Sequence, residues 1–169
     1  MPLQSIPNQV SALVGNQADA AMLQASVALP MVDRGDVKLI GWLSDEMSWQ
    51  LGVVFVTSKI ANEKADVIHR TLRAIGRGRQ DYVAAFIGPD GGLKLGPTSD
   101  DVLALLAKHL QQSPEQVKQG LLFMDPKGRL DETDILRQIA WYKSHGMLKG
   151  EIDGSGIIDS RYVAPMPPQ

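Results

Sequence analysis

The polar residues that could contact a small solute gather where apolar runs of the sequence end. Asp19 lies in the run ADAAML at 18–23, and Gln24 and Ser26 follow that run directly. Trp49 and Gln50 close a polar stretch that separates two further apolar runs. Amide and hydroxyl groups beside the free N–H groups of a helix start can hold a polar or anionic solute, and an indole ring can stack on it. We therefore expect ligand-binding residues at Asp19, Gln24, Ser26, Trp49 and Gln50.

Each of these residues also has a structural interpretation that stays open. Asp19 can bond backbone amides in a turn, and Gln24 and Ser26 can cap a helix. Trp49 can pack in the core instead of against a ligand. The sequence alone does not separate these roles.

Catalysis and metal binding find little support in the residue types and their spacing. His69, His109 and His145 all fall in expected helices, two of them near helix C-termini where a cation is favoured. Asp125 and Asp134 flank a glycine-containing turn, but the alternation of oxygen ligands that calcium loops need is absent. We predict turn and capping roles there, and no catalytic residue, metal site or cofactor.

Composition narrows the class of protein further. The chain has 169 residues, of which 44% are hydrophobic and 21% charged, so we expect a soluble globular fold. A net charge of −2 argues against nucleic-acid binding, which needs clustered Lys and Arg. There is no cysteine, and so no disulfide or thiolate chemistry. The first residues lack a signal-peptide pattern, so any export signal is expected to have been removed or not included.

Helices and a few strands must position the candidate residues. Helices are predicted after Ser5, over 25–34, from about 62 to 86, over 99–110, after the capping box SPEQ at 113–116, and after Asp131. Strands are predicted at 18–23, 37–43 and 51–57 from their apolar and β-branched residues. Three strands make a small sheet whose edges need covering, so we expect the chain to be part of a larger fold.

Three stretches in order carry a resemblance to one family. They are ALVGNQADAAML at 12–23, GVVFVTSKIANEKADVIHRTLRAIGRG at 52–78 and WYKSHGMLKGEIDGSGIIDSRYV at 141–163. The set resembles the C-terminal half of nitrate/sulfonate/taurine-type solute-binding proteins of ABC transporters. The family often has Trp, an acidic residue and Pro after the Asp-Ala strand, where this chain has Gln24, Ala25 and Ser26. That departure leaves the class of solute open.

The resemblance implies an α/β fold, a fragment of a type II periplasmic-binding-protein fold with a small sheet and a helix-rich C-terminal part. It implies the end of the second lobe at 1–43, a hinge connection at 44–51, part of the first lobe at 52–163 and a tail at 164–169. The implied function is binding of a small polar or anionic organic solute in an interlobe cleft, without chemistry, in the periplasm. The implied partners are the solute and a transporter permease in the membrane.

Two other functions stay open at this point. Pyrimidine-precursor synthases for thiamine resemble the same family and are enzymes, but they use a His-bearing site with iron, and no His lies at 19–26 or 44–50. The chain could also be a truncated product that binds no solute. Because the resemblance supplies no first lobe, the 51–57 strand is expected to pair with another copy in a homodimer.

Overall fold

A computed structural model describes residues 3, 5–47, 49–150 and 152–163, and the regular structure in these residues is helical. The helices are α1 (Ile6–Val14), α2 (Ala25–Asp33), α3 (Leu43–Glu46), α4 (Ser58–Glu63), α5 (Ala65–Phe86), α6 (Ser99–Leu110), α7 (Pro114–Gln119) and α8 (Glu132–Ser144), followed by the 3-10 turn η1 (Ser155–Ile157). The expected tail at 164–169 and Ser48 of the expected hinge lie outside the described residues.

The predicted α/β fold is wrong. Within the described ranges there is no sheet, and the β pairing consists of one isolated antiparallel bridge between Ile87 and Leu93. The runs at 18–23, 37–42 and 51–57 carry no strand assignment. Strand propensity reflects the fit of a side chain to a paired, half-buried surface, and no neighbouring strand provides that surface here. The predicted periplasmic-binding-protein architecture is therefore corrected to a helical one.

The predicted helices are confirmed, and side-chain caps mark the starts of α1, α4, α7 and α8. Helix α3 was not predicted and begins at Leu43, the last residue of the predicted 37–43 strand. Ser5 accepts a hydrogen bond from the N–H of Asn8 at the start of α1. Ser113 and Gln116 form both bonds of the capping box at the start of α7. Helix α5 runs without a break through Gly76 and Gly78, although each glycine weakens a helix interior. A separate short helix, α4, precedes it.

The largest cluster of buried side chains lies where the C-terminal end of α5 meets α6 and α7. Phe86 is fully buried there, and the ring of Tyr82 meets it edge-on with 4.9 Å between centroids. The buried members of the cluster are Ala85, Phe86, Leu103, Ala107 and Val117. Helix α2 packs on α7, which connects the N-terminal part of the chain to this core.

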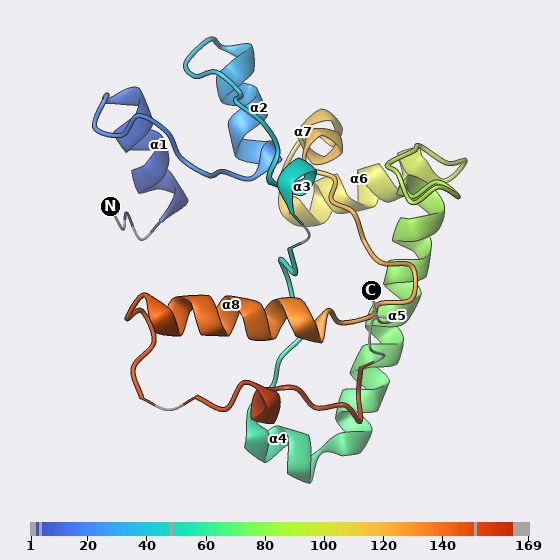
Figure 1. Cartoon of the computed structure of the whole chain (residues 1–169). Helices are drawn as coiled ribbons and strands as arrows, with labels where there is room; N and C mark the ends of the chain where they lie inside the picture. Colours follow the sequence, from blue (N-terminus) through green and yellow to red (C-terminus); the bar gives the residue numbers. More distant parts are fainter. Residues whose placement is uncertain (1–2, 4, 48, 151, 164–169) are drawn as a thin grey trace.

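The rest of the molecule is spread out around this core (Figure 1). Helix α5 runs down one side, with α6 at one end and α4 at the other. Helix α8 lies across the middle, and the chain between α3 and α4 is stretched past the N-terminal end of α8. The final described residues return to α4 and the N-terminal part of α5. There the Tyr162 hydroxyl donates to the carbonyl of Ala61 in α4 at 3.2 Å, and its ring lies 5.0 Å from that of His69 in α5.

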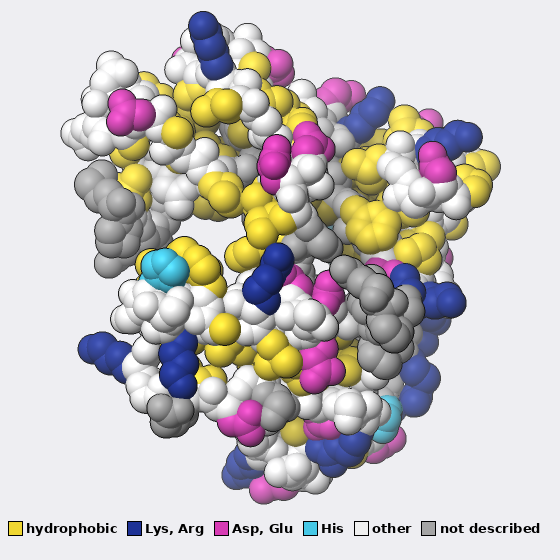
Figure 2. Space-filling view, in the orientation of Figure 1, with side chains coloured by type: hydrophobic (Ala, Val, Ile, Leu, Met, Phe, Trp, Pro, Cys, Tyr) yellow, Lys and Arg dark blue, Asp and Glu magenta, His cyan; other side chains and the backbone are white. Residues whose placement is uncertain are grey.

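Much apolar surface stays open to solvent in this arrangement. Figure 2 shows apolar side chains exposed across the upper and middle parts of one face. Phe55 is 87% exposed and Ile40 is 88% exposed, and both lie in runs predicted as strands. A monomer rarely leaves large apolar areas uncovered without an interaction to make.

Candidate functional site

The five expected ligand residues do not converge on one place. Asp19 is exposed between α1 and α2 and lines a surface hollow. The other residues of this hollow are Leu3, Gln9, Gln17, Ala18, Ala20, Ala21 and Met22. Gln24 is the exposed N-cap residue of α2, and its side chain makes no capping hydrogen bond. Trp49 and Gln50 belong to the stretched chain between α3 and α4.

Ser26 lies against the C-terminal end of α7. A Cβ atom placed on Gly120 would come within 2.9 Å of the Ser26 Cβ atom. Glycine at position 120 therefore permits the close approach of α2 to α7. This contact gives Ser26 a packing role in addition to any contact with a solute.

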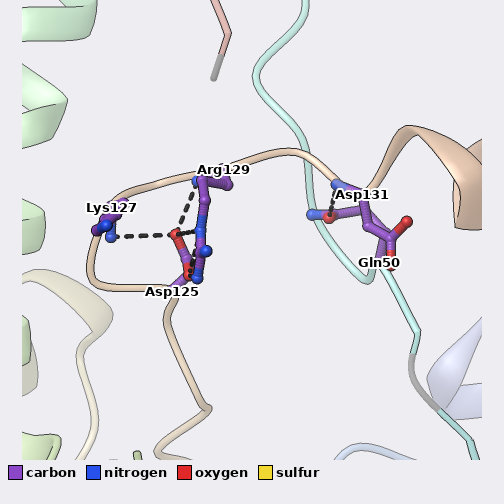
Figure 3. A network of polar contacts seen from close by, with 5 residues as sticks. All are labelled: Gln50, Asp125, Lys127, Arg129 and Asp131. Atoms are coloured by element: carbon purple, nitrogen blue, oxygen red, sulfur yellow. Dashed lines mark hydrogen bonds and ion pairs between the residues drawn. The ribbon is translucent and has the colours of Figure 1, made fainter. Parts of the chain in front are cut away.

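All four polar groups of Gln50 are hydrogen-bonded, three of them to α8 and to Asp131, the residue before it. Its backbone N–H donates to Asp134 Oδ2 at 2.6 Å, and its carbonyl accepts from Gln138 Nε2 at 3.3 Å. Its side-chain oxygen accepts from the backbone N–H of Asp131 at 3.1 Å, a contact visible in Figure 3. Its side-chain nitrogen donates to the carbonyl of Gly52 at 2.8 Å. Gln50 thus fixes the stretched chain to the first turns of α8.

Asp134 is the centre of this network and is only 4% exposed. Its carboxylate also accepts from Gln138 Nε2 at 2.7 Å and pairs with the guanidinium of Arg137. Burial raises the pKa of Asp134, but the hydrogen bonds from Gln50, Gln138 and Arg137 together outweigh it and hold the pKa below its ordinary value. Asp134 therefore stays ionised at neutral pH and serves as an acceptor.

A tight turn before α8 brings Asp131 to Gln50. Asp125 Oδ2 accepts from the N–H groups of Lys127 at 3.0 Å and Arg129 at 2.8 Å, and Arg129 Nη2 lies 2.5 Å from Asp125 Oδ1 (Figure 3). The hydrogen bond from Arg129 is the largest cause that lowers the pKa of Asp125. Gly128 has a φ of +62°, which this turn requires and which glycine adopts without strain.

The segment that Gln50 anchors, residues 51–57, has unpaired backbone. In the described part of the chain, the backbone N–H and C=O groups of Val53, Val54, Phe55 and Val56 make no hydrogen bond. The side chains are exposed on both faces, from 46% at Val56 to 87% at Phe55. We call residues 51–57 the open segment. Free backbone groups flanked by apolar side chains form a template for a β-strand.

The stretch that follows α7 shows how backbone groups outside a helix can be paired without a sheet. The Tyr82 hydroxyl donates to the carbonyl of Leu122 at 2.8 Å and accepts from its N–H at 3.0 Å. Both backbone groups of Leu122 are thus paired by one side chain. Burial raises the pKa of Tyr82, which keeps the hydroxyl protonated for this double role. The open segment has no such side chain.

His145 makes local contacts at the C-terminal end of α8. The ring of His145 stacks on Trp141 with 4.0 Å between centroids, and its Nδ1 lies 2.8 Å from the carbonyl of Trp141 at the end of α8. Among the residues that the structure describes, no group of three His, Cys, Asp or Glu side chains could hold a metal ion. In the same residues, no helix is both long and apolar enough to cross a membrane.

Gln50 was predicted from the sequence as a site residue, but its hydrogen-bond partners Asp131, Asp134 and Gln138 were not. Asp131 and Asp134 were predicted to have capping and turn roles, and Asp131 does cap α8 by accepting from the N–H of Asp134 at 3.0 Å. The spacing of Asp134 and Gln138 places them on one helix face. Nothing in the sequence indicates that this face meets a residue about eighty positions away.

Comparison with known proteins returned no match: no family model fits the chain, and no curated protein or solved structure is significantly similar to it. The kinship with nitrate/sulfonate/taurine-type binding proteins stays a prediction.

Proposed function

We propose that this chain is an incomplete binding module that joins a strand of a second polypeptide through the open segment. Any solute binding is then a property of the completed assembly. The observation that carries the proposal is the unpaired backbone of Val53 to Val56 between exposed apolar side chains. Addition of a strand to such a segment gains main-chain hydrogen bonds and removes apolar area from water.

The anchor at Gln50 supports this function, because it holds the open segment in place before a partner arrives. The N–H and C=O of Gln50 are fixed by the carboxylate of Asp134 and the amide of Gln138. The other end of the segment is held by α4, where the Thr57 hydroxyl accepts a hydrogen bond from the N–H of Ile60 at 3.3 Å. A segment fixed at both ends loses less conformational entropy on binding than a free one.

Hydrogen exchange tests this function directly. In the dilute chain the amides of 53–56 should exchange at nearly unprotected rates. Added peptides should protect them, and two are informative: one with the sequence of residues 49–57 and one of alternating Thr and Val. Protection by either peptide supports strand addition. Amides that are already protected in the dilute chain, or that neither peptide protects, would show that the segment takes no strand.

Solute binding is the second part of the proposal, and it rests on the sequence resemblance together with the position of Gln24. The Gln24 side chain is exposed at the start of α2 and makes no capping bond there, so it is free to contact a polar or anionic solute. The periplasmic placement and the permease partner expected from the resemblance belong to this part of the proposal.

A thermal-shift screen with small sulfonates, nitrate and amino acids tests the solute part, with and without the strand peptides. One class of solute should raise the melting temperature. The double change Gln24→Ala and Ser26→Ala should reduce that rise and leave the melting temperature without solute nearly unchanged, since the Ser26 Cβ atom that meets Gly120 is kept. A screen with no responding class would refute the solute part and leave strand addition standing.

A further inference from the structure

We infer that the strand partner is a second copy of this chain, paired antiparallel along the open segment with Val54 on the two-fold axis. The inference rests on the proposed strand addition and names its partner. It follows from which backbone edge is free, from the register that this edge permits and from the charges at the two ends of the segment.

The free edge is set by Gln50. In an extended chain the N–H and C=O of one residue point to the same side, and those of the next residue point to the opposite side. Both backbone groups of Gln50 point to α8. The backbone edge formed by residues 50, 52, 54 and 56 therefore meets α8 at Gln50. On that side Gln50 and the carbonyl of Gly52 are already paired. The opposite side has free N–H and C=O groups at residues 51, 53 and 55, and it is the side on which we place the partner strand.

An antiparallel pair of identical segments has a register that uses this side. With Val54 opposite Val54 of the other copy, Val53 lies opposite Phe55, and Leu51 lies opposite Thr57. Val53 and Phe55 have free N–H and C=O groups on this side and form the hydrogen-bonded pairs, whereas the carbonyl of Thr57 already accepts from the N–H of Ala61 in α4. Val54 then forms a close, non-hydrogen-bonded pair on the axis.

The side chains of this register are compatible. Opposed residues lie on the same face of a pair of strands, so Val53 of one copy packs beside the aromatic ring of Phe55 of the other, and the pairing is made twice by symmetry. Such aromatic and β-branched pairs are among the favourable cross-strand neighbours. No residue from 51 to 57 is charged, so nothing in the segment repels an identical strand.

The charges at the two ends favour the antiparallel arrangement over a parallel one. Asp45 and Glu46 precede the open segment in α3, and Lys59 follows it in α4. Antiparallel pairing brings the acidic end of one copy toward the end of the other copy that carries Lys59. Parallel pairing would place the two acidic ends together, which costs energy through like-charge repulsion.

Helix α8 occupies the start of the other edge of the open segment. In the dimer the outer edge of each strand begins against the α8 of its own chain, through Gln50 and Asp134. Beyond Gln50 and the carbonyl of Gly52, the backbone groups of Val54 and Val56 on this outer edge are unpaired. The pairing itself uses the same edge of both copies, as in an isologous dimer.

Introduced thiols test the register, because the chain has no cysteine of its own. Val54→Cys puts two thiols opposite each other on the axis, with about 4.5 Å between the Cα atoms, within the range that a disulfide spans. Val56→Cys is the matched control. It lies on the same face of the segment, but its copies are separated by about 13 Å along the strands. Mild oxidation should give a disulfide-linked dimer roughly tenfold faster for Val54→Cys than for Val56→Cys.

Sedimentation of the unmodified chain between nanomolar and micromolar concentration provides the second measurement. The mass should rise to that of a dimer. Val54→Lys should abolish the rise, because it places two ammonium groups together on the axis. Ile40→Lys should not, although Ile40 is as exposed as any residue of the segment.

A monomeric mass at all concentrations, or equal cross-linking rates at positions 54 and 56, overturns the inference. If the Thr-Val peptide still protects the amides of 53–56 in that case, strand addition is retained and the partner is a different polypeptide. If no peptide protects them, the proposed function fails as well.

Discussion

Removal of the Asp134 carboxylate should release the open segment from α8. In Asp134→Ala the N–H of Gln50 and the side-chain amide of Gln138 lose their acceptor, at 2.6 and 2.7 Å in the structure. Hydrogen bonds to a charged acceptor contribute about 1.5–3 kcal/mol each, and loss of two at the lower end of that range gives about 3 kcal/mol. The ion pair with the half-exposed Arg137 adds about 0.5 kcal/mol at most.

Urea unfolding followed by circular dichroism measures the free energy of unfolding of this variant. Glu132→Ala is the matched control. It removes a carboxylate from the same first turn of α8, but one that is exposed. Its effect should be limited to the loss of a favourable charge near the helix N-terminus, about 0.5 kcal/mol.

The effect of Asp134 should depend on pH with a defined sign. Its pKa is lowered in the folded chain, so its contribution is complete above the unfolded value, about 3.9, and is lost as the pH falls through the folded pKa. The difference in unfolding free energy between the original chain and Asp134→Ala should therefore be constant between about pH 5 and pH 7, roughly one to three units above the unfolded pKa. The difference should shrink below about pH 4. A loss below about 1 kcal/mol, or a difference that persists unchanged in acid, would refute the reasoning.

Further substitutions test the helical core and the hydrogen bonds between Tyr82 and the backbone of Leu122. Ser113→Ala removes the capping box of α7 and should cost about 1 kcal/mol in urea unfolding without affecting solute affinity; loss of affinity at unchanged stability would contradict a scaffold role. Tyr82→Phe leaves both backbone groups of Leu122 without their partner and should cost about 2 kcal/mol, with faster amide exchange at that residue. Phe86→Ala empties a fully buried site and should cost about 4 kcal/mol, whereas Phe55→Ala should leave the melting temperature of the dilute chain unchanged because its ring is exposed. Similar losses for the two phenylalanines would show that the open segment is buried.

Local signals in the sequence located most of the helices, but not α3. Ser5 caps α1, the residues SPEQ form the capping box of α7, and Asp131 caps α8, all as predicted. These features depend on neighbours three or four residues away, which the sequence shows directly. The ion pair of Asp66 with Arg70 in α5 depends on the same spacing.

The candidate site could be predicted only in part. The sequence selected Gln50 as a polar residue at the end of an apolar run, but its contacts with Asp131, Asp134 and Gln138 join parts of the chain far apart in sequence. Such contacts form only when α8 and the stretched chain are brought together. Gln24 is the N-cap residue of α2 and Asp19 lies between α1 and α2, whereas Gln50 belongs to the chain between α3 and α4.

The sequence by itself located most of the helices and identified the run at 51–57 as apolar, but the strand predicted there was wrong. The tertiary structure decided that this run pairs with nothing inside the described chain. The physical reason is that a helix satisfies its own backbone within a few residues, whereas a strand depends on a neighbour that is distant in sequence or part of another molecule.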